Sequence, residues 1–444
     1  MIKEILKKYS PKFFRNFYQR ILNLIFNFFY YIKFKNPSRD LIVIGVTGTK
    51  GKSTTCYLIY KILNDLNIKT GICSSDFIGF GEKLEVNKTT NTMPGRGFLH
   101  IFLKEAKENN CKIAVLEVTS EGLMFWRHKF IDFDFGVFLN IHPEHIERHG
   151  SFENYKKAKR KLFEAVAKSK KIKFLDGKRV EKTIIANLDD NQFHYFTNFK
   201  NLKIISFGIK SQAQIKPINY EISKEGIYFT LFGERFFSPL LGFFNLYNIL
   251  ASICVPYSLN LLDVQKIKQT INSIKGMPGK MDLIYDKDFK IMIDYAHTPD
   301  SITAVFETVK EMYNPKRILV LIGADGDRDK WKRPLFGEIC AKYADVIVIS
   351  EINSRDEDPL EIAKQIEKGA KNYIEKWNLK KDILIILDRR DAINWLVKNS
   401  KEGDLILSLV KGSEPFIVLK DKKIEWNERD EFLKAVENLK NKIN

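Results

Sequence analysis

The sequence predicts an α/β protein with two doubly wound domains in series, each a parallel sheet wrapped by helices. From residue 41 onward, short apolar runs typical of buried strands alternate with longer segments of helical period. The alternation is interrupted by Lys-Gly-Met-Pro-Gly-Lys at residues 275–280, where glycine and proline mark a domain border. At 444 residues with 44% apolar side chains, the chain is long enough to fill the cores of two or three domains.

The first α/β domain is expected to cover residues 38–277. A helix should begin at residue 52, and a long basic helix should cover 151–166. Residues 214–240 are expected to form short consecutive strands, an antiparallel flap, with helices between 245 and 275. The apolar runs that predict the parallel strands of this domain are 41–46, 69–75, 113–118, 135–140, 182–187 and 203–208.

The second α/β domain is expected to cover residues 278–444. Pro299 and Pro359 each follow an apolar run, and proline is favoured in the first turn of a helix, so we expect helices to begin there. Further helices are expected near 332–343, after residue 388 and at the C-terminus. The apolar runs that predict strands are 291–296, 317–324, 346–350, 383–388 and 405–410.

Residues 1–37 stand apart as an aromatic amphipathic helix with basic flanks. Its apolar run is interrupted by Asn23 and Asn27 and is too short to cross a bilayer. The helix is therefore expected either to pack on the rest of the protein or to make a peripheral contact with a membrane through residues 12–35. The apolar residues that share one side at helical spacing are Phe14, Tyr18, Ile21, Ile25, Phe28 and Ile32.

The charge and cysteine content narrow the possible partners. An excess of 73 basic over 55 acidic residues gives a net charge of +18, which suits an anionic partner but equally fits a lysine- and isoleucine-rich codon bias. The lysines are scattered singly, so nucleic acid is not expected. Five widely spaced cysteines favour neither a disulfide scaffold nor a zinc site, and they fit a reducing cytosol. We expect a cytoplasmic monomer.

A phosphate-binding loop is predicted where the first strand meets the first helix. Two glycines allow backbone amides to approach phosphate oxygens at a helix N-terminus, Lys52 can meet the outer phosphates, and Ser53 can hold Mg²⁺. Val46 stands where the usual motif has its first glycine. ATP or a relative is the expected ligand of a P-loop mononucleotide-binding central domain, followed by a Rossmann-like C-terminal domain. The candidate nucleotide-binding residues are Thr47, Gly48, Thr49, Lys50, Gly51, Lys52, Ser53 and Thr54.

Two further segments offer metal ligands. Glu117 ends an apolar strand, where open parallel sheets place ligand-contacting groups, although a solvated strand end would look the same. The segment 138–150 then carries His142, His145 and His149; neutral imidazole is a good metal ligand, but a histidine-rich loop without a metal is equally common.

Lys159 is the one lysine expected to face inward from the helix 151–166. It shares a stripe with Tyr155, Leu162, Phe163 and Val166, whereas the other basic residues of the helix point elsewhere. An inward ammonium beside Mg²⁺ would be repelled, so its chemistry must differ. The alternative is a lysine stem that lies along the core with its amine reaching solvent.

Together these segments resemble the Mur ligase family, ATP-dependent enzymes that join an amino acid to a carboxylate. The resemblance runs from about residue 41 to 429 and rests on several motifs in order: VTGTKGKST, LEVTSEG, NIHPEHIERHGSFENYKKAK, GFFNLYN, PGKMD, DYAHTPDSI, GADGDRDKWKRP, DRRDAI and KGSE. It implies an amide-forming ligase of peptidoglycan precursor synthesis that acts through an acyl phosphate. The reacting carboxylate would belong to a UDP-muramyl-peptide-type acceptor.

The resemblance also implies roles for individual residues. Lys52 would contact the terminal phosphates, and Ser53, Glu117 and His145 would surround Mg²⁺. Lys159 matches the lysine that the family carbamylates with CO₂, which would turn a repelling amine into an anion that steadies the metal. The residues matched to nucleotide contacts are Asn245, Asn248, Asp294 and His297. The residues matched to contacts with the acceptor or the amino acid are Thr119, Arg127, Arg328, Asn353, Arg355 and Glu414.

The sequence departs from the family pattern in two places. About forty residues stand where the family has a UDP-binding N-terminal domain. Ile352-Asn353-Ser354-Arg355 replaces the Asp-Asn-Pro-Arg run of the diaminopimelate-using enzymes, so the added amino acid is diaminopimelate or lysine, with diaminopimelate favoured. The competing hypotheses are a folylpolyglutamate synthetase-like ligase and a non-catalytic nucleotide-binding protein at the membrane.

Overall fold

The computed structural model describes residues 12–441 except 90, 145 and 275, and the chain divides into two compact units. The first unit holds most residues up to Ile274, and the second holds most residues from 275 onward. The predicted division at residues 37/38 and 277/278 remains a prediction.

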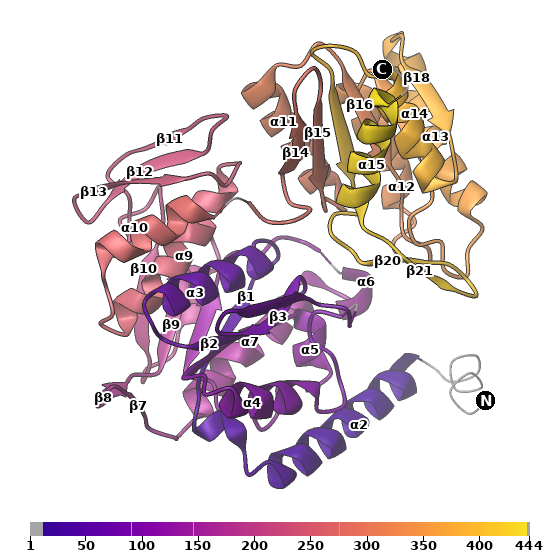
Figure 1. The fold of residues 1–444 in the computed structure, drawn as a ribbon. Helices are drawn as coiled ribbons and strands as arrows, with labels where there is room; N and C mark the ends of the chain where they lie inside the picture. The colour runs from indigo at the N-terminus through magenta and orange to yellow at the C-terminus, as the bar shows by residue number, and fades with distance from the viewer. Residues whose placement is uncertain (1–11, 90, 145, 275, 442–444) are drawn as a thin grey trace. The chain divides into compact units, whose positions relative to one another are not determined.

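The first unit is built on an eight-stranded sheet with the order β10-β9-β6-β1-β5-β2-β3-β4 (Figure 1). The six predicted strands are confirmed and pair in parallel. The two edge strands β3 and β4 were not predicted; they form an antiparallel hairpin, so the sheet is mixed. The strands are β1 Ile42–Thr47, β2 Thr70–Cys73, β3 Phe77–Phe80, β4 Lys83–Val86, β5 Ile113–Glu117, β6 Phe135–Phe138, β9 Thr183–Asn187 and β10 Lys203–Phe207.

Helices pack against this sheet, and small sheets extend it. Apolar residues of α4, α7 and α8 share one core with β1, β5 and β6, while α3 and α9 pack against each other. The predicted flap is confirmed as the antiparallel sheet of β11 Tyr220–Ile222, β12 Ile227–Leu231 and β13 Glu234–Ser238. The other elements are α2 Lys12–Lys33, η1 Pro37–Arg39, α3 Lys52–Asp65, α4 Phe98–Glu108, α5 Ser120–Met124, α6 Ile146–His149, α7 Phe152–Lys168, β7 Lys173–Leu175, β8 Lys178–Val180, α8 Phe193–Thr197, α9 Phe244–Ser258 and α10 Val264–Ser273.

Two glycines in the strands bring α7 close to the sheet. A Cβ added at Gly45 of β1 would lie 2.6 Å from a methyl carbon of Leu162. At Gly136 of β6 it would lie 2.8 Å from a ring carbon of Phe163. Because both neighbours belong to α7, the absence of side chains at these positions sets how near the helix approaches. This close packing places the inward-facing side of α7 beneath the end of β1.

The second unit carries a six-stranded sheet with the order β14-β15-β19-β16-β17-β18. All five predicted strands are present and pair in parallel, and only β14, at one edge, is antiparallel. The predicted helices are present, including those that begin at Pro299 and Pro359. The elements are β14 Asp282–Asp286, β15 Lys290–Asp294, α11 Pro299–Tyr313, β16 Ile318–Ile322, α12 Lys332–Tyr343, β17 Val346–Ile349, α13 Pro359–Trp377, β18 Asp382–Ile385, α14 Arg389–Asn399, β19 Leu405–Leu409, β20 Phe416–Val418, β21 Lys423–Glu425 and α15 Glu428–Lys440.

A buried ion pair joins the first turns of α14 and α15. Arg389 and Glu428 are 3% and 1% exposed, and the guanidinium reaches Glu428 Oε1 at 2.7 Å. Ser408 Oγ and Trp426 Nε1 each donate to the same carboxylate at 2.6 Å. Burial by itself raises the pKa of Glu428, but the charge of Arg389 and these hydrogen bonds outweigh it and lower the pKa. The pair is therefore fully compensated within the core of the second unit.

Breaking this pair should destabilise the second unit strongly. Glu428→Ala leaves a buried guanidinium without its counter-charge, and we expect a loss of about 3–5 kcal/mol in the free energy of unfolding, measured by urea denaturation. Glu431→Ala is the matched control, because Glu431 lies one turn further along α15 and pairs with the more exposed Arg390. The control should cost less than about 1 kcal/mol. Equal losses in the two variants would contradict this account.

Candidate active site

The predicted strand–turn–helix is confirmed at the phosphate-binding loop. β1 ends at Thr47, α3 begins at Lys52, and Gly51 adopts φ 84°, which only glycine takes without strain. A Cβ at Gly51 would also lie 2.2 Å from Asn248 Oδ1. Among the residues that the structure describes, no side chain caps the start of α3. The backbone amides of its first turn are therefore placed to bind an anion.

Asn140, which sequence reasoning missed, holds the loop from the neighbouring strand. The amides of Thr49 and Lys50 donate to Asn140 Oδ1 at 3.1 and 2.9 Å. Asn140 Nδ2 in turn donates to the carbonyl oxygen of Lys50 at 3.1 Å. These two loop amides are thus used within the protein, which leaves the first turn of α3 to meet phosphate. Asn140 lies two residues after the end of β6, and that position near a strand end was the available signal.

The cationic and hydroxyl side chains expected at a nucleotide lie on the first turn of α3. Lys52 Nζ donates to the carbonyl oxygen of Thr49 at 2.9 Å, which folds the ammonium back over the loop. Ser53 and Thr54 are 7% and 5% exposed. Asn140, Lys52 and Ser53 therefore surround one short stretch of backbone.

The predicted asparagine pair of α9 lies beside this loop. Thr55 Oγ1, in the second turn of α3, donates to Asn248 Oδ1 at 3.3 Å. Asn248 Nδ2 donates to Asn245 Oδ1 at 2.8 Å. Because the tight glycine at position 51 abuts the same Asn248 side chain, helix α9 forms one wall of the loop.

Lys159 is buried directly beneath the loop, and its predicted inward orientation is confirmed. Its side chain is 1% exposed, and Nζ donates to the carbonyl oxygen of Gly48 at 2.7 Å. The amine also lies 4.9 Å from the ring centre of Tyr155, whose hydroxyl is 3.1 Å from Thr49 Oγ1. The alternative of an amine that reaches solvent is therefore wrong.

Burial sets the protonation of Lys159. Desolvation lowers the pKa of this amine well below its usual value, and the positive charge of Lys52 lowers it further. The carboxylates of Glu144 and Glu117 oppose both effects without cancelling them. Burial and Lys52 therefore both favour the neutral form of the amine, which keeps its lone pair.

Glu117 supplies a carboxylate next to the loop. It ends β5, pairs in register with Val46 of β1 and is 3% exposed. One of its oxygens accepts from the amide of Ser75 at 2.7 Å. The predicted ligand His145 lies outside the described residues. Among residues whose placement is described, no cluster of three or more histidines, cysteines or acidic residues is arranged to hold a metal.

These groups nevertheless fit Mg²⁺ bound together with a nucleotide. Mg²⁺ is typically held by one or two protein oxygens, substrate phosphates and water. Glu117 and Ser53 provide a buried carboxylate and a hydroxyl at the ends of adjacent secondary-structure elements. A cluster of three protein ligands is therefore not required.

The predicted acceptor contacts Thr119 and Arg127 flank the short helix α5. Thr119 is its N-cap, and its hydroxyl accepts from the amide of Gly122 at 3.0 Å. Arg127 Nη1 donates to the carbonyl oxygen of Met93 at 2.7 Å, while its buried Nε has no hydrogen-bond partner in the described part of the chain. Burial lowers the pKa of Arg127. Arg127 thus ties the segment after α5 to the loop at residues 92–97.

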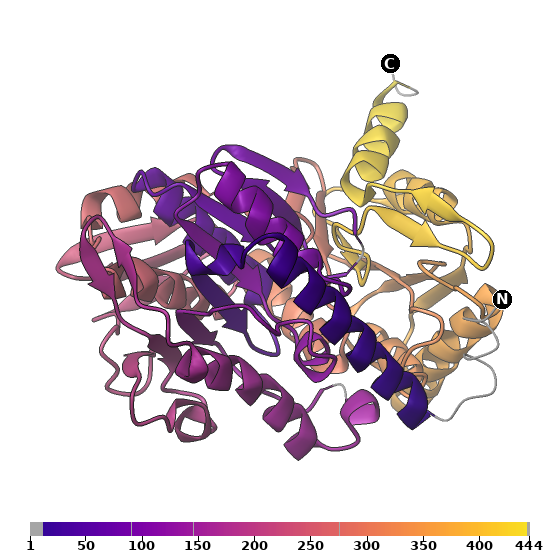
Figure 2. The same ribbon diagram turned by 90° about the horizontal axis from the view of Figure 1, so that it is seen from below.

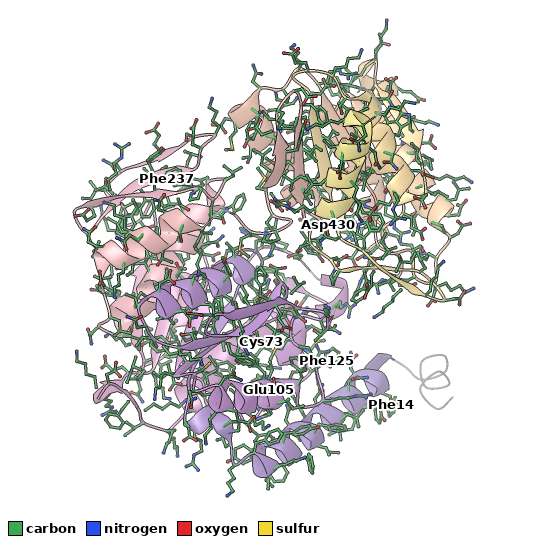
Figure 3. All side chains as sticks on the ribbon, in the orientation of Figure 1. Phe14, Cys73, Glu105, Phe125, Phe237 and Asp430 are labelled. Atoms are coloured by element: carbon green, nitrogen blue, oxygen red, sulfur yellow. The ribbon has the colours of Figure 1, made fainter. Side chains whose placement is uncertain are left out.

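Helix α2 holds both of these segments through polar side chains. Asn23 Oδ1 accepts from the amide of Arg96 at 2.9 Å, and its Nδ2 donates to the carbonyl oxygen of Phe125, labelled in Figure 3, at 3.0 Å. Asn27 Nδ2 donates to the carbonyl oxygen of Trp126 at 2.9 Å. The two asparagines that interrupt the apolar run of α2 are therefore its polar anchors, and Tyr31 adds an aromatic contact with Phe130 on the same side, at 5.4 Å between ring centres.

In the second unit, a polar cluster forms around Glu414. Its carboxylate accepts from Asn353 Nδ2 and from Lys411 Nζ, both at 3.0 Å, and from the Tyr295 hydroxyl at 3.3 Å. Asn353 Nδ2 also donates to Asp325 Oδ1 at 2.8 Å. Burial lowers the pKa of Lys411, and the charge of Glu414 opposes this shift. The predicted Asn353 and Glu414 are brought together, and the segments that follow β15, β16 and β19 supply the missed Tyr295, Asp325 and Lys411.

The predicted Asp294 and His297 lie at the end of β15, next to Tyr295 of the same cluster. Asp294 accepts from the amides of Met281 and Ala296, each at 2.7 Å. His297 Nδ1 lies 3.0 Å from the carbonyl oxygen of Tyr295. These bonds fix the turn that leads into α11.

The two predicted arginines of the second unit differ in their surroundings. Arg355 adopts φ 56°, and its amide donates to the carbonyl oxygen of Val418 at 3.1 Å. No described residue forms a hydrogen bond with its buried Nε. Asn353 Oδ1 accepts from the amide of the same Val418 at 2.9 Å, so Arg355 adjoins the polar cluster. Arg328 is exposed in the loop after β16.

Comparison with known proteins decides the family. Residues 46–256 match the Mur ligase middle domain, and residues 279–413 match the glutamate ligase domain of Mur ligases. A UDP-N-acetylmuramoyl-L-alanyl-D-glutamate–2,6-diaminopimelate ligase of Halalkalibacterium halodurans is 33% identical over 88% of this chain and 78% of its own length. The chain belongs to the Mur ligase family.

Further relatives of this Mur ligase agree. A UDP-N-acetylmuramyl-tripeptide synthetase of Borrelia garinii subsp. bavariensis is 34% identical over 91% of this chain and 78% of its own. A solved structure of a diaminopimelate ligase superposes with a TM-score of 0.61 at 26% identity, covering 90% of this chain and 78% of that one. This Mur ligase is therefore an ATP-dependent, amide bond-forming ligase of peptidoglycan precursor synthesis, and its middle domain binds ATP.

Proposed function

We propose that this Mur ligase joins diaminopimelate or lysine to the carboxylate of a UDP-muramyl-peptide-type acceptor through an acyl phosphate. The observation that carries the proposal is the buried Lys159, its pKa lowered by desolvation, beneath a phosphate-binding loop lined by Lys52, Ser53 and Glu117. The names of two relatives, a diaminopimelate ligase and a tripeptide synthetase, support the same acceptor and amino-acid classes.

The reaction follows from what the loop can stabilise. An acceptor carboxylate oxygen attacks the γ-phosphorus of ATP, the bond to the β–γ bridging oxygen breaks, and ADP and an acyl phosphate result. Lys52 and the amides of the first turn of α3 offset the negative charge that spreads over the transferred group. The amine of the amino acid then attacks the acyl carbon, loses a proton and expels inorganic phosphate, which leaves an amide.

Mg²⁺ would be held by Ser53 and Glu117 together with the nucleotide phosphates. When bound, it neutralises phosphate charge and draws electron density from the γ-phosphorus. His145 remains a proposed ligand.

We propose that Lys159 is carbamylated. A neutral amine attacks the carbon of CO₂ and loses a proton, which gives a carbamate anion, whereas a protonated amine has no lone pair to do so. Burial lowers the pKa of Lys159 and so provides the neutral form. The remaining N–H can still donate to the carbonyl oxygen of Gly48. The carbamate anion would attract the nearby Lys52, whereas an ammonium on Lys159 would repel it.

The polar cluster of the second unit supports an amino acid as co-substrate. Glu414 can pair with an ammonium, and Arg355, with its unpartnered Nε, can pair with a carboxylate. Diaminopimelate carries one carboxylate more than lysine, so the arginine favours diaminopimelate. We propose further that Asp294 and His297 contact the nucleotide. Thr119 and Arg127 would contact the acceptor, and Arg328 and Asn353 would contact the acceptor or the amino acid.

We infer a cytoplasmic site of action. All five cysteines are free and buried, as expected in a reducing compartment. Among the described residues, no helix combines the length and apolar character that a membrane crossing requires.

Phosphate release from ATP tests the proposed function. Release should require the UDP-muramyl-dipeptide acceptor and an amino acid together, since the acyl phosphate forms only on the acceptor and turns over only when an amine attacks it. ATP hydrolysis that proceeds at the same rate with neither substrate would contradict the proposal and favour a nucleotide-binding protein without ligase activity.

Helix α2 anchors the segments around the predicted acceptor contacts, so a change in α2 should affect binding of the acceptor. Asn23→Ala removes two hydrogen bonds, one to Arg96 and one to Phe125, which lies between the predicted acceptor contacts Thr119 and Arg127. We expect the KM for the acceptor to rise about tenfold, with the KM for ATP unchanged, because each buried hydrogen bond contributes about 1 kcal/mol. Gln19→Ala, at an exposed position of the same helix, is the control. An unchanged acceptor KM in Asn23→Ala would show that α2 does not shape the acceptor site.

A further inference from the structure

The side of α2 that faces away from the protein is apolar. Large side chains line it from the second turn to the last, and each is between 49% and 58% exposed. Figure 2 shows α2 as a long helix along the surface of the first unit. We call this surface the outer face of α2; its residues are Phe17, Tyr18, Ile25, Phe28, Phe29 and Ile32. Phe28 lies at its border, where its ring centre is 5.5 Å from that of Phe130.

The exposure of the outer face is built into the fold. The opposite side of the helix is held by Arg20, Asn23 and Asn27, which bond to the carbonyl oxygens of residues 124–126. Asn23 and Asn27 are 2% and 1% exposed. Because successive residues of a helix turn by about 100°, burying the outer face would require rotating these anchors into solvent and breaking their bonds. The polar anchors therefore fix the rotation of the helix, and its apolar side is left facing outward.

The charge of the helix fits an anionic surface. Five basic residues and no acidic one lie between residues 12 and 35. At the C-terminal end, Lys33 Nζ lies 5.7 Å from the ring centre of Phe29, so a cation borders the apolar face. An apolar side with basic flanks is the pattern of helices that lie in the plane of a membrane interface. The basic residues are Lys12, Arg15, Arg20, Lys33 and Lys35.

We propose that the outer face of α2 docks this enzyme on the surface of an anionic lipid bilayer. The apolar side chains enter the headgroup region, while the basic flanks meet lipid phosphates. A second copy of the chain is the less suitable occupant, because each copy carries a net charge of +18 and like charges repel. The proposal concerns where the enzyme works, and it stands whether or not the assignment of acceptor and amino acid holds.

Vesicle sedimentation of the full chain tests the proposal. We expect the wild type to sediment with phosphatidylcholine vesicles that contain about 30% phosphatidylglycerol, and much less with pure phosphatidylcholine. The variant Ile25→Asp/Ile32→Asp should lower the bound fraction about tenfold, because two charges then replace apolar contacts. High salt should weaken wild-type binding several-fold. Ile218→Asp, at a position 77% exposed elsewhere in the first unit, is the control and should bind like the wild type.

Three results would overturn the proposal. Equal sedimentation of the wild type and the double variant would show that the outer face takes no part. Equal binding to charged and neutral vesicles would show that binding does not depend on anionic lipid. A wild-type dimer that becomes monomeric in the double variant, without vesicle binding in either, would assign the face to a second copy. Unchanged thermal unfolding of both variants shows that the chain still folds, as expected for exposed positions.

Discussion

Lys159→Ala should lower kcat by about 10²–10³-fold, because it removes a buried group beside the phosphate-binding loop that has no substitute there. Lys159 Nζ bonds to Gly48 within the loop and lies under the influence of Lys52, Glu117 and Glu144. The loss should fall on kcat more than on the KM for ATP, since the carbamate is proposed to steady charge that develops during phosphoryl transfer. Initial rates of phosphate release with both substrates present give the measurement.

Two controls separate the carbamate from a structural effect of Lys159. Lys157→Ala removes a lysine from the exposed side of the same helix and should leave the rate unchanged. A short carboxylate such as acetate or formate, added to Lys159→Ala, should restore part of the activity by taking the place of the carbamate anion. Full activity of Lys159→Ala without any addition would remove the carbamate from the mechanism. A dead variant that no carboxylate restores would contradict it as well.

Glu414→Gln should raise the KM for the amino acid about 100-fold, because a neutral amide replaces the carboxylate proposed to hold the substrate ammonium. A charge-assisted contact of this kind contributes about 1.5–3 kcal/mol. The amide keeps the shape of the side chain, so Asn353 and Tyr295 can retain their bonds to this position. The KM values for ATP and for the acceptor should stay unchanged.

Ser413→Ala, at the preceding residue, is the control for Glu414→Gln. Lys411 loses its counter-charge in Glu414→Gln and is fully buried, so thermal unfolding should be recorded for both variants. A proportional rise in all three KM values would point to local unfolding. An unchanged KM for the amino acid would place the amino-acid site elsewhere.

The features that the sequence predicts well depend on local periodicity. The run 41–46 followed by two glycines and a polar helix start indicates a strand, a turn and a helix before any tertiary contact is known. The inward orientation of Lys159 follows from the apolar residues at helical spacing on either side of it, and its exposure of 1% agrees. The second domain is predictable for the same reason, since its strands are continuous apolar runs.

Short edge elements lacked such a signal. The strands β3 and β4 have four residues each, and a run of that length carries too little alternation to predict a strand. β14, at the edge of the second sheet, also gives a weak signal, because it mixes apolar and charged residues. Within the two large sheets, these are the strands that pair in an antiparallel manner.

The orientation of α2 shows a different limit of sequence reasoning. An apolar stripe usually faces a protein core, and the structure places polar anchors there instead. The side of an amphipathic helix that packs on the protein depends on hydrogen-bond acceptors in other segments. Here the carbonyl oxygens of residues 125 and 126 accept from the asparagines of α2. The contacts of Asn140 and the cluster around Glu414 were unpredictable for a similar reason, since their partners come from distant segments.

The mass of the reaction product tests the central claim most directly. The full chain would be incubated with ATP, Mg²⁺, UDP-muramyl-dipeptide and a mixture of amino acids. The account predicts a product heavier than the acceptor by one diaminopimelate or lysine less one water, with one ADP formed for each product. ADP formation without any gain in acceptor mass would contradict it.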